Sequence, residues 1–443
     1  MALMKGSPEE VLGMCQRLAC PEGDVPLDQT AAEAIAAANA SMAGRAMRVL
    51  ALAERRLPDG YAPEELARDY TFLGLIGLVD PIRPAVPAAV EALRGAGIRT
   101  VMITGDQALT ATAVARELGL DLDKTSSLHV LEAGDLAALD HETLRGLVRD
   151  VQVFARVPPE MKLAIVRALQ ANGDVVAMTG DGVNDGPALR AADVGVAMGQ
   201  HGTELARELA DVVLSTDDFS LMADAVEEGR LVRANVRRVL HYLLTTNASE
   251  VWVVAGAVLV GLPSPLTPLQ LLWLNLVTDI APGLGLAVEP REPDLMRQPP
   301  RDPREPIIPR PLLRRILAES SAIAAGALAS YALGMARHGR GPIAQTMAFA
   351  SLVGAQLLHA PLARAGSRPA TVGQRPANRP LALGLGVSAA LQLVALFVPP
   401  VRRVLGGAAL GLVDLGIAAL GAVLPILAIE AERRTRLGVA KLG

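Results

Sequence analysis

Hydrophobic and polar positions follow different patterns in the two halves of this chain. Between residues 67 and 235, short apolar runs alternate with amphipathic stretches, which predict helices such as Pro84–Ala96, Leu109–Leu118 and Pro159–Ala171. The apolar runs predict six strands: Phe72–Val79, Ile98–Ile103, Val151–Ala155, Val175–Met178, Val194–Ala197 and Val212–Leu214. This alternation predicts an α/β domain in which helices cover both faces of a parallel sheet.

Uncharged apolar segments dominate the chain after residue 236. Six of them approach the ~20 residues that a membrane-spanning helix needs. They are 238–261, 267–288, 313–335, 343–362, 381–399 and 408–429. Buried helices of a soluble domain do not explain so many such segments in a row. We therefore expect a six-helix membrane domain over 236–431 and a cytosolic tail over 432–443.

Residues 1–66 form a third region with a weaker pattern. We expect a helix around 29–43 and a second helical segment at Arg48–Ala53. The region is too short and too polar for a hydrophobic core of its own. We therefore expect it to be the end of a domain whose beginning precedes residue 1.

Composition narrows the classes of function. Hydrophobic residues make up 51% of the chain and aromatic residues only 2%, which disfavours the aromatic platforms that bind single-stranded nucleic acids. The net charge of -4, from 42 basic and 46 acidic residues, also argues against a nucleic-acid partner. Cys15 and Cys20 match neither a zinc-binding nor a redox spacing, so we expect free thiols in a reducing cytosol. The first residues lack the apolar core of a signal peptide.

Basic residues distinguish the two sides of the expected membrane domain. If the α/β half lies in the cytosol, the outward loops contain four basic residues, Arg337, Arg340, Arg402 and Arg403. The inward loops and the tail contain fifteen. This distribution follows the positive-inside rule, so we expect a multi-pass membrane protein whose α/β half is cytosolic.

The segment Thr179–Leu189, with the sequence TGDGVNDGPAL, follows one of the expected strands. Its glycines and its proline predict a tight loop, and loops at the ends of parallel strands are where α/β folds do chemistry. Asp181 and Asp185 lie four residues apart with no basic residue between them. Two acids so close repel each other unless a cation lies between them, and Mg²⁺ with a phosphate is the usual solution. A helix-capping role would suit a lone Gly-Asp-Gly but does not explain eleven specified residues.

Two further polar residues fit phosphate binding. Thr104 begins a Thr-Gly-Asp sequence directly after the expected strand Ile98–Ile103, where a hydroxyl and the N–H groups of a helix start can bind a phosphate. A simple helix cap explains this triplet equally well. Lys162 lies near the start of the expected helix Pro159–Ala171, and taken alone it is typical of a solvated surface lysine.

Taken in chain order, Thr104, Lys162 and the pair of aspartates resemble the phosphoryl-transfer pattern of haloacid-dehalogenase-like proteins. The segment Thr179–Leu189 closely resembles the hinge motif of P-type ion-pumping ATPases, with Gly186 where the usual form has Ala. The resemblance implies a haloacid-dehalogenase-like, Rossmannoid phosphorylation domain over 67–235, followed by six transmembrane helices.

The resemblance also implies roles for the matching residues. Thr104 and Lys162 would hold the phosphoryl oxygens, and Asp181 would hold Mg²⁺. Asn184 and Asp185 would complete the catalytic set. ATP and Mg²⁺ are the implied cofactors.

Other segments extend the resemblance over the whole chain. Lys5–Glu9 is similar to that family's Lys-Gly-Ala-Pro-Glu, and Arg48–Ala53 is similar to its Arg-x-Leu-Ala-Leu-Ala run. Asp80–Arg83 fits its Asp-Pro-x-Arg, and Phe154–Lys162 fits its Phe-Ala-Arg segment. By this resemblance, 1–66 is part of a nucleotide-binding domain. The residues implied to contact or lie near the nucleotide or the hinge are Lys5, Arg48, Asp80, Arg83, Gly105, Asp106 and Arg156.

The family's nucleophile is an aspartate in the sequence Asp-Lys-Thr-Gly-Thr, which we expect upstream of Lys5. The segment Asp123–Ser126 begins similarly, but it lacks the glycine and follows Thr104 instead of preceding it, so we expect a polar loop. The chain then resembles the C-terminal portion of such an ATPase, without the phosphorylated aspartate, the actuator domain and the first four membrane helices. A separate chain that supplies this N-terminal half is left open as a partner.

Polar residues inside the first two apolar segments indicate a cation site, because such residues are costly in a membrane. Asn247 and Glu250 are three residues apart and share a helix face, as do Asn275, Thr278 and Asp279 on the next segment. Two carboxylates with amide and hydroxyl oxygens suit a hard cation. Hydrogen bonds between helices would explain the asparagines but hardly both acids.

These two segments, and the loop Met296–Ile307, closely resemble parts of calcium-type P-type pumps. Gln356 stands where two-site calcium pumps carry a glutamate, which removes one negative charge and makes Gln356 a weak ligand candidate. We therefore expect the C-terminal part of an ATP-driven pump for a calcium-like cation in the plasma or cell inner membrane, with the cation and the lipid bilayer as partners. The alternative is a non-catalytic membrane cation-binding module or a decayed remnant of such a pump. A stand-alone phosphatase is disfavoured because the nucleophile is missing.

Overall fold

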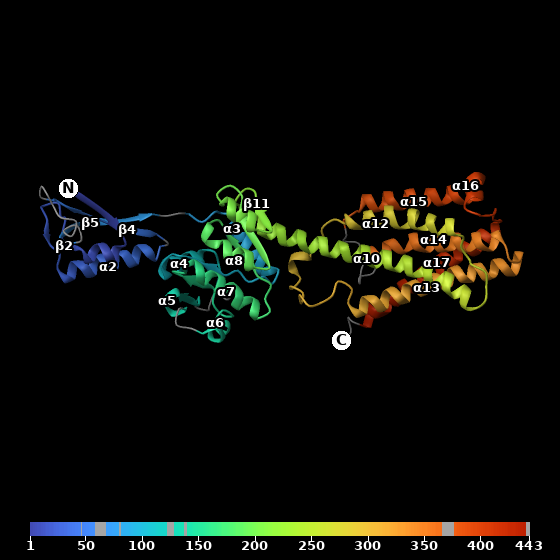
Figure 1. Ribbon diagram of the computed structural model, residues 1–443, viewed down its shortest axis with the longest axis horizontal. Coiled ribbons are helices and arrows are strands. Elements are labelled where there is room, and N and C mark those ends of the chain that lie inside the picture. The colour runs from blue at the N-terminus through green and yellow to red at the C-terminus, as the bar shows by residue number, and fades with distance from the viewer. Residues whose placement is uncertain are drawn as a thin grey trace. The chain divides into compact units, whose positions relative to one another are not determined.

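The computed structural model describes residues 1–45, 47–57, 68–78, 81–121, 128–136, 140–365 and 376–439, with only the backbone of 436–439. The chain divides into two compact units (Figure 1). One contains Met1–Ala225 and Met296–Pro300, and the other contains Val226–Leu295 and Arg301–Gly443.

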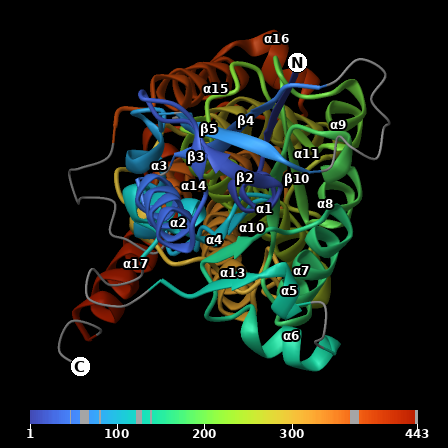
Figure 2. The same cartoon turned by 90° about the vertical axis from the view of Figure 1, so that its left-hand side faces the viewer.

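A five-stranded sheet forms the N-terminal part of the first unit. Its strands lie in the order β1 (Ala2–Gly6), β4 (Arg48–Arg55), β5 (Tyr70–Leu78), β2 (Cys15–Leu18) and β3 (Val25–Pro26), and Figure 2 labels the last four. Helices α1 (Pro8–Gly13) and α2 (Gln29–Ala43) accompany the sheet. The buried core of this region consists of Val11, Cys15, Ala51, Ala53, Tyr70 and Phe72.

Both cysteines in this region are free thiols, as expected. Burial raises the pKa of the Cys15 thiol to about 11. Because the thiolate is the reactive form, Cys15 is protonated and unreactive at neutral pH.

Three expectations for this region are wrong. Arg48–Ala53 is not helical but forms most of β4, because β1 and β5 on either side satisfy its backbone hydrogen bonds. An apolar run of this length fits either structure until its partners are known. The strand expected at Phe72–Val79 forms as β5, but it pairs antiparallel with β4 and parallel with β2, so it belongs to the five-stranded sheet and not with the other expected strands. β5 also supplies Tyr70 and Phe72 to a small core that the sequence did not lead us to expect.

Two three-stranded parallel sheets form the rest of the first unit. One has the order β6 (Met102–Ile103), β8 (Val153–Ala155), β7 (Val130–Glu132), and the other has the order β11 (Val212–Leu214), β10 (Val194–Met198), β9 (Ala177–Gly180). The parallel pairing confirms the expected α/β type, although the strands fall into two sheets instead of one. The helices are α3 (Val86–Gly95), α4 (Ala108–Glu117), α5 (Ala133–Leu136), α6 (His141–Leu147), α7 (Pro159–Ala171), α8 (Gly186–Ala191) and α9 (Glu204–Leu209).

Helix α7 joins the cores of the two parallel sheets. Its bounds are those expected from the sequence, because Pro159 fixes the first turn and lacks only an N–H that the helix does not use. Ile165 packs with Phe154 of β8, whereas the next residue, Val166, packs with Met178 of β9. All four side chains are buried. The first turn of α7, which carries Lys162, is therefore held by packing against both sheets.

Helices make up the second unit. They are α10 (Leu221–Leu259) from Val226 onward, then α11 (Pro268–Leu274), the π-helical turn η3 (Asn275–Asp279), α12 (Ile280–Ala287), α13 (Arg310–His338), α14 (Pro342–Ala365), α15 (Arg379–Phe397), α16 (Pro399–Val404) and α17 (Leu412–Val439). The short η4 (Leu295–Arg297) begins with the last residue of Val226–Leu295 and continues into the segment of the first unit. Among the described residues, six helices are long and apolar enough to cross a membrane, and α11, η3 and α12 together count as one of these. The six expected spans are therefore confirmed in length and composition.

Small residues bring α13, α14 and α17 into close contact. A Cβ atom added to Gly326 of α13 would lie 2.2 Å from the carbonyl oxygen of Gly421 in α17. A Cβ atom added to Gly421 would lie 2.1 Å from Oγ of Ser330 and 2.6 Å from Oγ of Ser351 in α14. The three helix backbones approach each other at this point only because no side chain separates them.

We expect Gly421→Ala to destabilise the membrane unit by about 1–3 kcal/mol, the usual cost of overpacking a well-packed core. The measurement is the thermal unfolding midpoint of the detergent-solubilised protein. Gly416→Ala is the matched control, because Gly416 lies in the same helix and an added Cβ would meet no atom within 4 Å. Equal midpoints for the two variants would contradict the proposed close approach.

Candidate functional site

The loop after β9 brings Asp185 back against the end of the strand. β9 ends at Gly180, Asp181 follows, and the one-turn helix η2 (Val183–Asp185) leads into α8. A Cβ atom on Gly180 would lie 2.6 Å from Cβ of Asp185, so only glycine permits this fold of the loop. As a result Asp185 is buried, while Asp181 and Asn184 remain exposed.

Lys162 pairs with Asp185. Nζ of Lys162, in the first turn of α7, donates to Oδ1 of Asp185 at 2.6 Å, and the two side chains are only 18% and 10% exposed. Lys162 therefore compensates the charge of the buried Asp185, whereas Asp181 remains accessible. Asp181 is also fixed by its backbone, because its carbonyl oxygen accepts a hydrogen bond from Thr203 N–H at 2.8 Å.

Thr104 and Asp106 form a second polar turn at the end of β6. The hydroxyl of Thr104 donates to Oδ2 of Asp106 at 3.0 Å, and Asp106 N–H donates to the threonine oxygen at 3.1 Å. Arg156 N–H donates to the carbonyl of Asp106 at 2.9 Å, which ties this turn to the loop after β8. Arg156 adopts a φ of 52° at this point, and Gly105 lies between the two polar residues with no atom within 4 Å of an added Cβ.

Lys5 and Arg48 lie on neighbouring strands of the five-stranded sheet. Lys5 of β1 is opposite Leu52 of β4, and Arg48 is four residues before Leu52. Side chains alternate along a strand, so both basic side chains point to the same face, about 13 Å apart along β4. Both are exposed.

Arg83 contacts the loop that precedes α10. Its guanidinium donates to the carbonyl oxygen of Asp217, a residue with a φ of 53°. Burial works to raise the pKa of the Asp217 carboxyl, but hydrogen bonds from Gln200 N–H and from His201 outweigh it and lower the pKa to about 2. The ionised Asp217 thus anchors this loop. Asp80 and the segment Asp123–Ser126 lie outside the described residues.

In the membrane unit, Asp279 accepts hydrogen bonds from two residues of α10. Asn247 Nδ2 donates to Oδ2 of Asp279 at 3.0 Å, and the hydroxyl of Thr246 donates to Oδ1 at 3.1 Å. The hydroxyl of Thr278 also donates to Oδ1, at 3.3 Å. Asn247, Thr278 and Asp279, which the sequence placed on two separate segments, therefore form one cluster.

Glu250 lies one turn further along α10 and contacts Gln356 of α14. Gln356 Nε2 donates to Oε1 of Glu250, and it also lies 3.2 Å from the hydroxyl of Ser249 and from the carbonyl of Thr246. Glu250 is 7% exposed and Gln356 is fully buried. The amide oxygen of Gln356 is buried without a hydrogen-bond partner among the described residues. It is thus an oxygen that can take a cation.

Two family descriptions match this chain. "Cation transporting ATPase, C-terminus" matches residues 263–435, and "haloacid dehalogenase-like hydrolase" matches residues 17–193. The calcium-transporting ATPase of Bacillus subtilis is 41% identical over 367 residues, which are 82% of this chain and 41% of that protein. The probable cation-transporting ATPase F of Mycobacterium bovis is 40% identical over 94% of this chain and 46% of its own length. The human calcium-transporting ATPase type 2C member 1 is 35% identical over 94% of this chain and 44% of its own length.

Over most of its length the chain is similar to cation-transporting ATPases. It spans about half the length of the curated relatives it matches. The six apolar helices and this family together make it a multi-pass membrane protein. The α/β half has the expected haloacid-dehalogenase-like type.

One residue expected in the cluster around Asp279 does not join it in the structure. Asn275 is exposed, and its side-chain amide donates to the carbonyl of Leu271 at 3.0 Å. Asn275 begins the π-helical turn η3, and such turns occur frequently at functional sites. The carbonyl oxygen of Thr278 in the same turn accepts a hydrogen bond from the hydroxyl of Tyr242 at 2.7 Å.

Thr246, Ser249 and the π-helical turn were not expected from the sequence. Thr246 lies four residues before Glu250 on α10, so the i, i+4 spacing was a usable signal for a shared face. The contact of Ser249 with Gln356 joins residues 107 apart in sequence and had no such signal.

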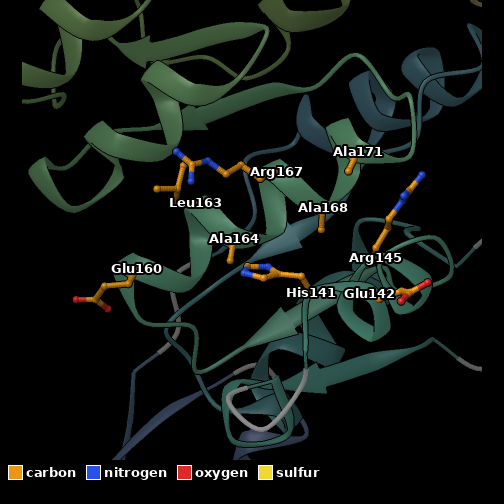
Figure 3. Close-up of a pocket in the computed structure, with 9 residues that line it drawn as sticks. All are labelled: His141, Glu142, Arg145, Glu160, Leu163, Ala164, Arg167, Ala168 and Ala171. Atoms are coloured by element: carbon orange, nitrogen blue, oxygen red, sulfur yellow. The ribbon is translucent and has the colours of Figure 1, made fainter.

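A surface pocket in the α/β half lies apart from these residues. It has a volume of about 600 Å³ and is lined by α6, with His141, Glu142 and Arg145, and by the outer side of α7 (Figure 3). Lys162 and the other predicted site residues are not among its lining. The pocket is therefore separate from the strand ends that carry Thr104 and Asp181.

Proposed function

We propose that this chain is the C-terminal half of an ATP-driven P-type pump for a calcium-like divalent cation. The observation that carries the proposal is a pair of acids, the buried Glu250 and the half-buried Asp279, which accept hydrogen bonds from amides and hydroxyls of apolar helices. Uncompensated carboxylates at such a place are costly and mark ion pathways. The related calcium-transporting ATPases support the ion class.

The α/β half would supply the phosphate chemistry. Asp181 is exposed beside the Lys162–Asp185 pair, which suits Mg²⁺ bound through a carboxylate together with phosphate oxygens. Mg²⁺ bound there would neutralise charge on the phosphoryl group. Thr104 and Lys162 would orient the phosphoryl oxygens through their hydroxyl and ammonium groups, and Asn184 would add an amide. Lys5 and Arg48, both exposed on one sheet face, would contact ATP.

The membrane unit would hold the cation with oxygen ligands only. Asp279, Glu250, Asn247 and Thr278 would supply the carboxylate, amide and hydroxyl oxygens that hard cations prefer. Gln356 would add its amide oxygen, which is buried without a hydrogen-bond partner among the described residues. This makes Gln356 a better ligand than its sequence context indicated. The cluster contains two carboxylates, which is enough charge for a single divalent ion.

The N-terminal half would supply the phosphorylated aspartate, because Asp-Lys-Thr-Gly-Thr does not occur in these 443 residues. We expect the complete protein to form an acyl-phosphate with labelled ATP and Mg²⁺, and the 443-residue chain alone to form none, since covalent catalysis needs the nucleophilic carboxylate. The measurement is a hydroxylamine-sensitive labelled band on an acid gel. A band at the mass of the isolated chain would refute the assignment. A complete protein that binds the cation but never becomes labelled would instead be a non-catalytic binding module.

A further inference from the structure

A cluster of three titratable side chains lies in the membrane unit and takes no part in the proposed cation site. It consists of His241 of α10, Glu319 of α13 and His359 of α14. Their exposed fractions are 3%, 4% and 0%. Each residue comes from a different helix, so the cluster ties three helices of the unit together, and all three helices are labelled in Figure 1.

Both imidazoles point at one oxygen of the carboxylate. Nε2 of His241 lies 2.7 Å from Oε2 of Glu319, and Nε2 of His359 lies 2.8 Å from the same oxygen. Arg315 occupies the other carboxylate oxygen, since its Nε donates to Oε1 at 2.7 Å. The ring of Tyr242 stacks on His359 with the ring centroids 6.1 Å apart. Neighbouring residues thus hold the carboxylate and one imidazole in fixed orientations.

We propose that His241, Glu319 and His359 form a binding site for a divalent transition-metal ion of the zinc class. Two imidazole nitrogens and one carboxylate oxygen are ligands that Zn²⁺ and Co²⁺ bind well, whereas Ca²⁺ and Mg²⁺ prefer oxygen alone. The donor set therefore differs in kind from the oxygen cluster around Asp279. The site selects a class of metal that the proposed transport site does not favour.

The ligand atoms need to move little to accept an ion. The three lie within 4.8 Å of one another. Tetrahedral ligands about 2.1 Å from a zinc ion stand about 3.4 Å apart, so each nitrogen must retreat from the carboxylate oxygen by less than about 1 Å. In the hydrogen-bonded arrangement each Nε2 donates its proton to Oε2 of Glu319. Binding a metal through Nε2 therefore requires each neutral imidazole to change to the tautomer with its proton on Nδ1. The carboxylate and the arginine compensate each other in charge.

An ion at this site would restrain α10. His241 lies nine residues before Glu250 on the same helix, a rise of about 14 Å. A metal bond to His241 would fix this turn of α10 against α13 and α14. A zinc-class ion would thus hold in place the helix that carries a proposed transport ligand, without occupying the transport site.

The test uses the complete protein in detergent, with Co²⁺ as the probe and excess Ca²⁺ to fill the oxygen cluster. We expect the intense visible absorption of four-coordinate Co²⁺, saturating at one ion per chain, and its loss on addition of Zn²⁺. His241→Gln and His359→Gln should each weaken Co²⁺ binding by about 100-fold or more. Loss of a residue that only hydrogen-bonds to a metal ligand already weakens metal affinity by about 10- to 100-fold, and these variants remove a ligand itself. His359→Cys should retain binding and add a thiolate-to-cobalt charge-transfer band in the near ultraviolet.

His338→Gln is the matched control. His338 also lies in α13 and contacts a carboxylate, Asp414, at 2.9 Å, but the cluster does not include it. Its removal should leave the cobalt spectrum unchanged. The proposal is overturned if the unaltered protein takes up no Co²⁺ under these conditions. It is also overturned if His241→Gln, His359→Gln and His359→Cys all give the cobalt spectrum of the unaltered protein. Either result would make the cluster a hydrogen-bonded clamp between helices and nothing more.

Discussion

Glu250→Gln and Asp279→Asn should each nearly abolish cation-stimulated ATP hydrolysis by the complete pump at physiological cation concentrations. Either change removes one of the two negative charges that would face the ion, so a bound divalent cation is left with one charge uncompensated. Removing one partner of a buried pair of opposite charges costs about 3–5 kcal/mol, which corresponds to roughly 100-fold or more in the cation dissociation constant. The measurement is ATP hydrolysis and labelled calcium uptake in vesicles as a function of cation concentration.

Two further variants make this prediction specific. Gln356→Ala removes a neutral oxygen and should shift the cation dependence less than either acid variant. Asp302→Asn is the control, because Asp302 is an exposed acid in a loop of the same unit and its carboxylate accepts only from the neighbouring Arg304 N–H among the hydrogen bonds found. An unchanged cation dependence in both acid variants would remove Glu250 and Asp279 from the transport site.

Inserting a Gly-Pro pair near Arg233 should abolish cation uptake while ATP hydrolysis continues. Arg233 lies in α10, which runs as one helix of 39 residues, about 58 Å, without an internal proline. A continuous helix transmits displacement stiffly, and proline breaks it at a cost of about 3 kcal/mol. We infer that α10 is the mechanical link between phosphate chemistry near Asp181 and cation binding near Glu250, and linkage requires each site to change the affinity of the other equally.

The control variant for this insertion is Gly229→Ala, which should stabilise α10 instead of breaking it. Gly229 is the weakest helix former in this part of α10, and an added Cβ would meet no atom within 4 Å. Gly229→Ala should therefore keep hydrolysis and uptake coupled. If the Gly-Pro variant also pumps with unchanged stoichiometry, α10 is not the link.

Local signals in the sequence were sufficient for part of the fold. Helix α7 could be placed because Pro159 marks its start and its apolar residues repeat with helical spacing. The six apolar helices could be placed because the length required by a bilayer leaves few alternatives. By contrast, Arg48–Ala53 was misjudged, because only its neighbours β1 and β5 decide that this apolar run is a strand. The sequence of one strand alone does not show which distant strand it pairs with.

The same distinction applies to the sites. The spacing of Asn247 and Glu250 predicted one polar face of α10. In the structure Asn247 donates a hydrogen bond to Asp279, so residues from the two predicted segments do form one cluster. The role of Gln356 and the exposure of Asn275 could not be foreseen, because both depend on how separate helices pack. The cluster of His241, Glu319 and His359 gave no signal at all, since 78 residues separate the first two. Each of its members is unremarkable within its own segment.

The π-helical turn η3 also sets the rotational phase of its helix. Within the turn, the side chain of Asp279 and the carbonyl oxygen of Thr278 contact α10. After the turn, Gly285 faces α15, where an added Cβ would lie 2.5 Å from Cα of Leu381. One residue of an α-helix corresponds to about 100° of rotation, so the extra residue in a π turn offsets the two faces by about that angle. Deleting a single residue here would keep a straight helix but turn one face away from its partner. The packing of this span against its neighbours is therefore more sensitive to a change in the length of η3 than to substitutions within it.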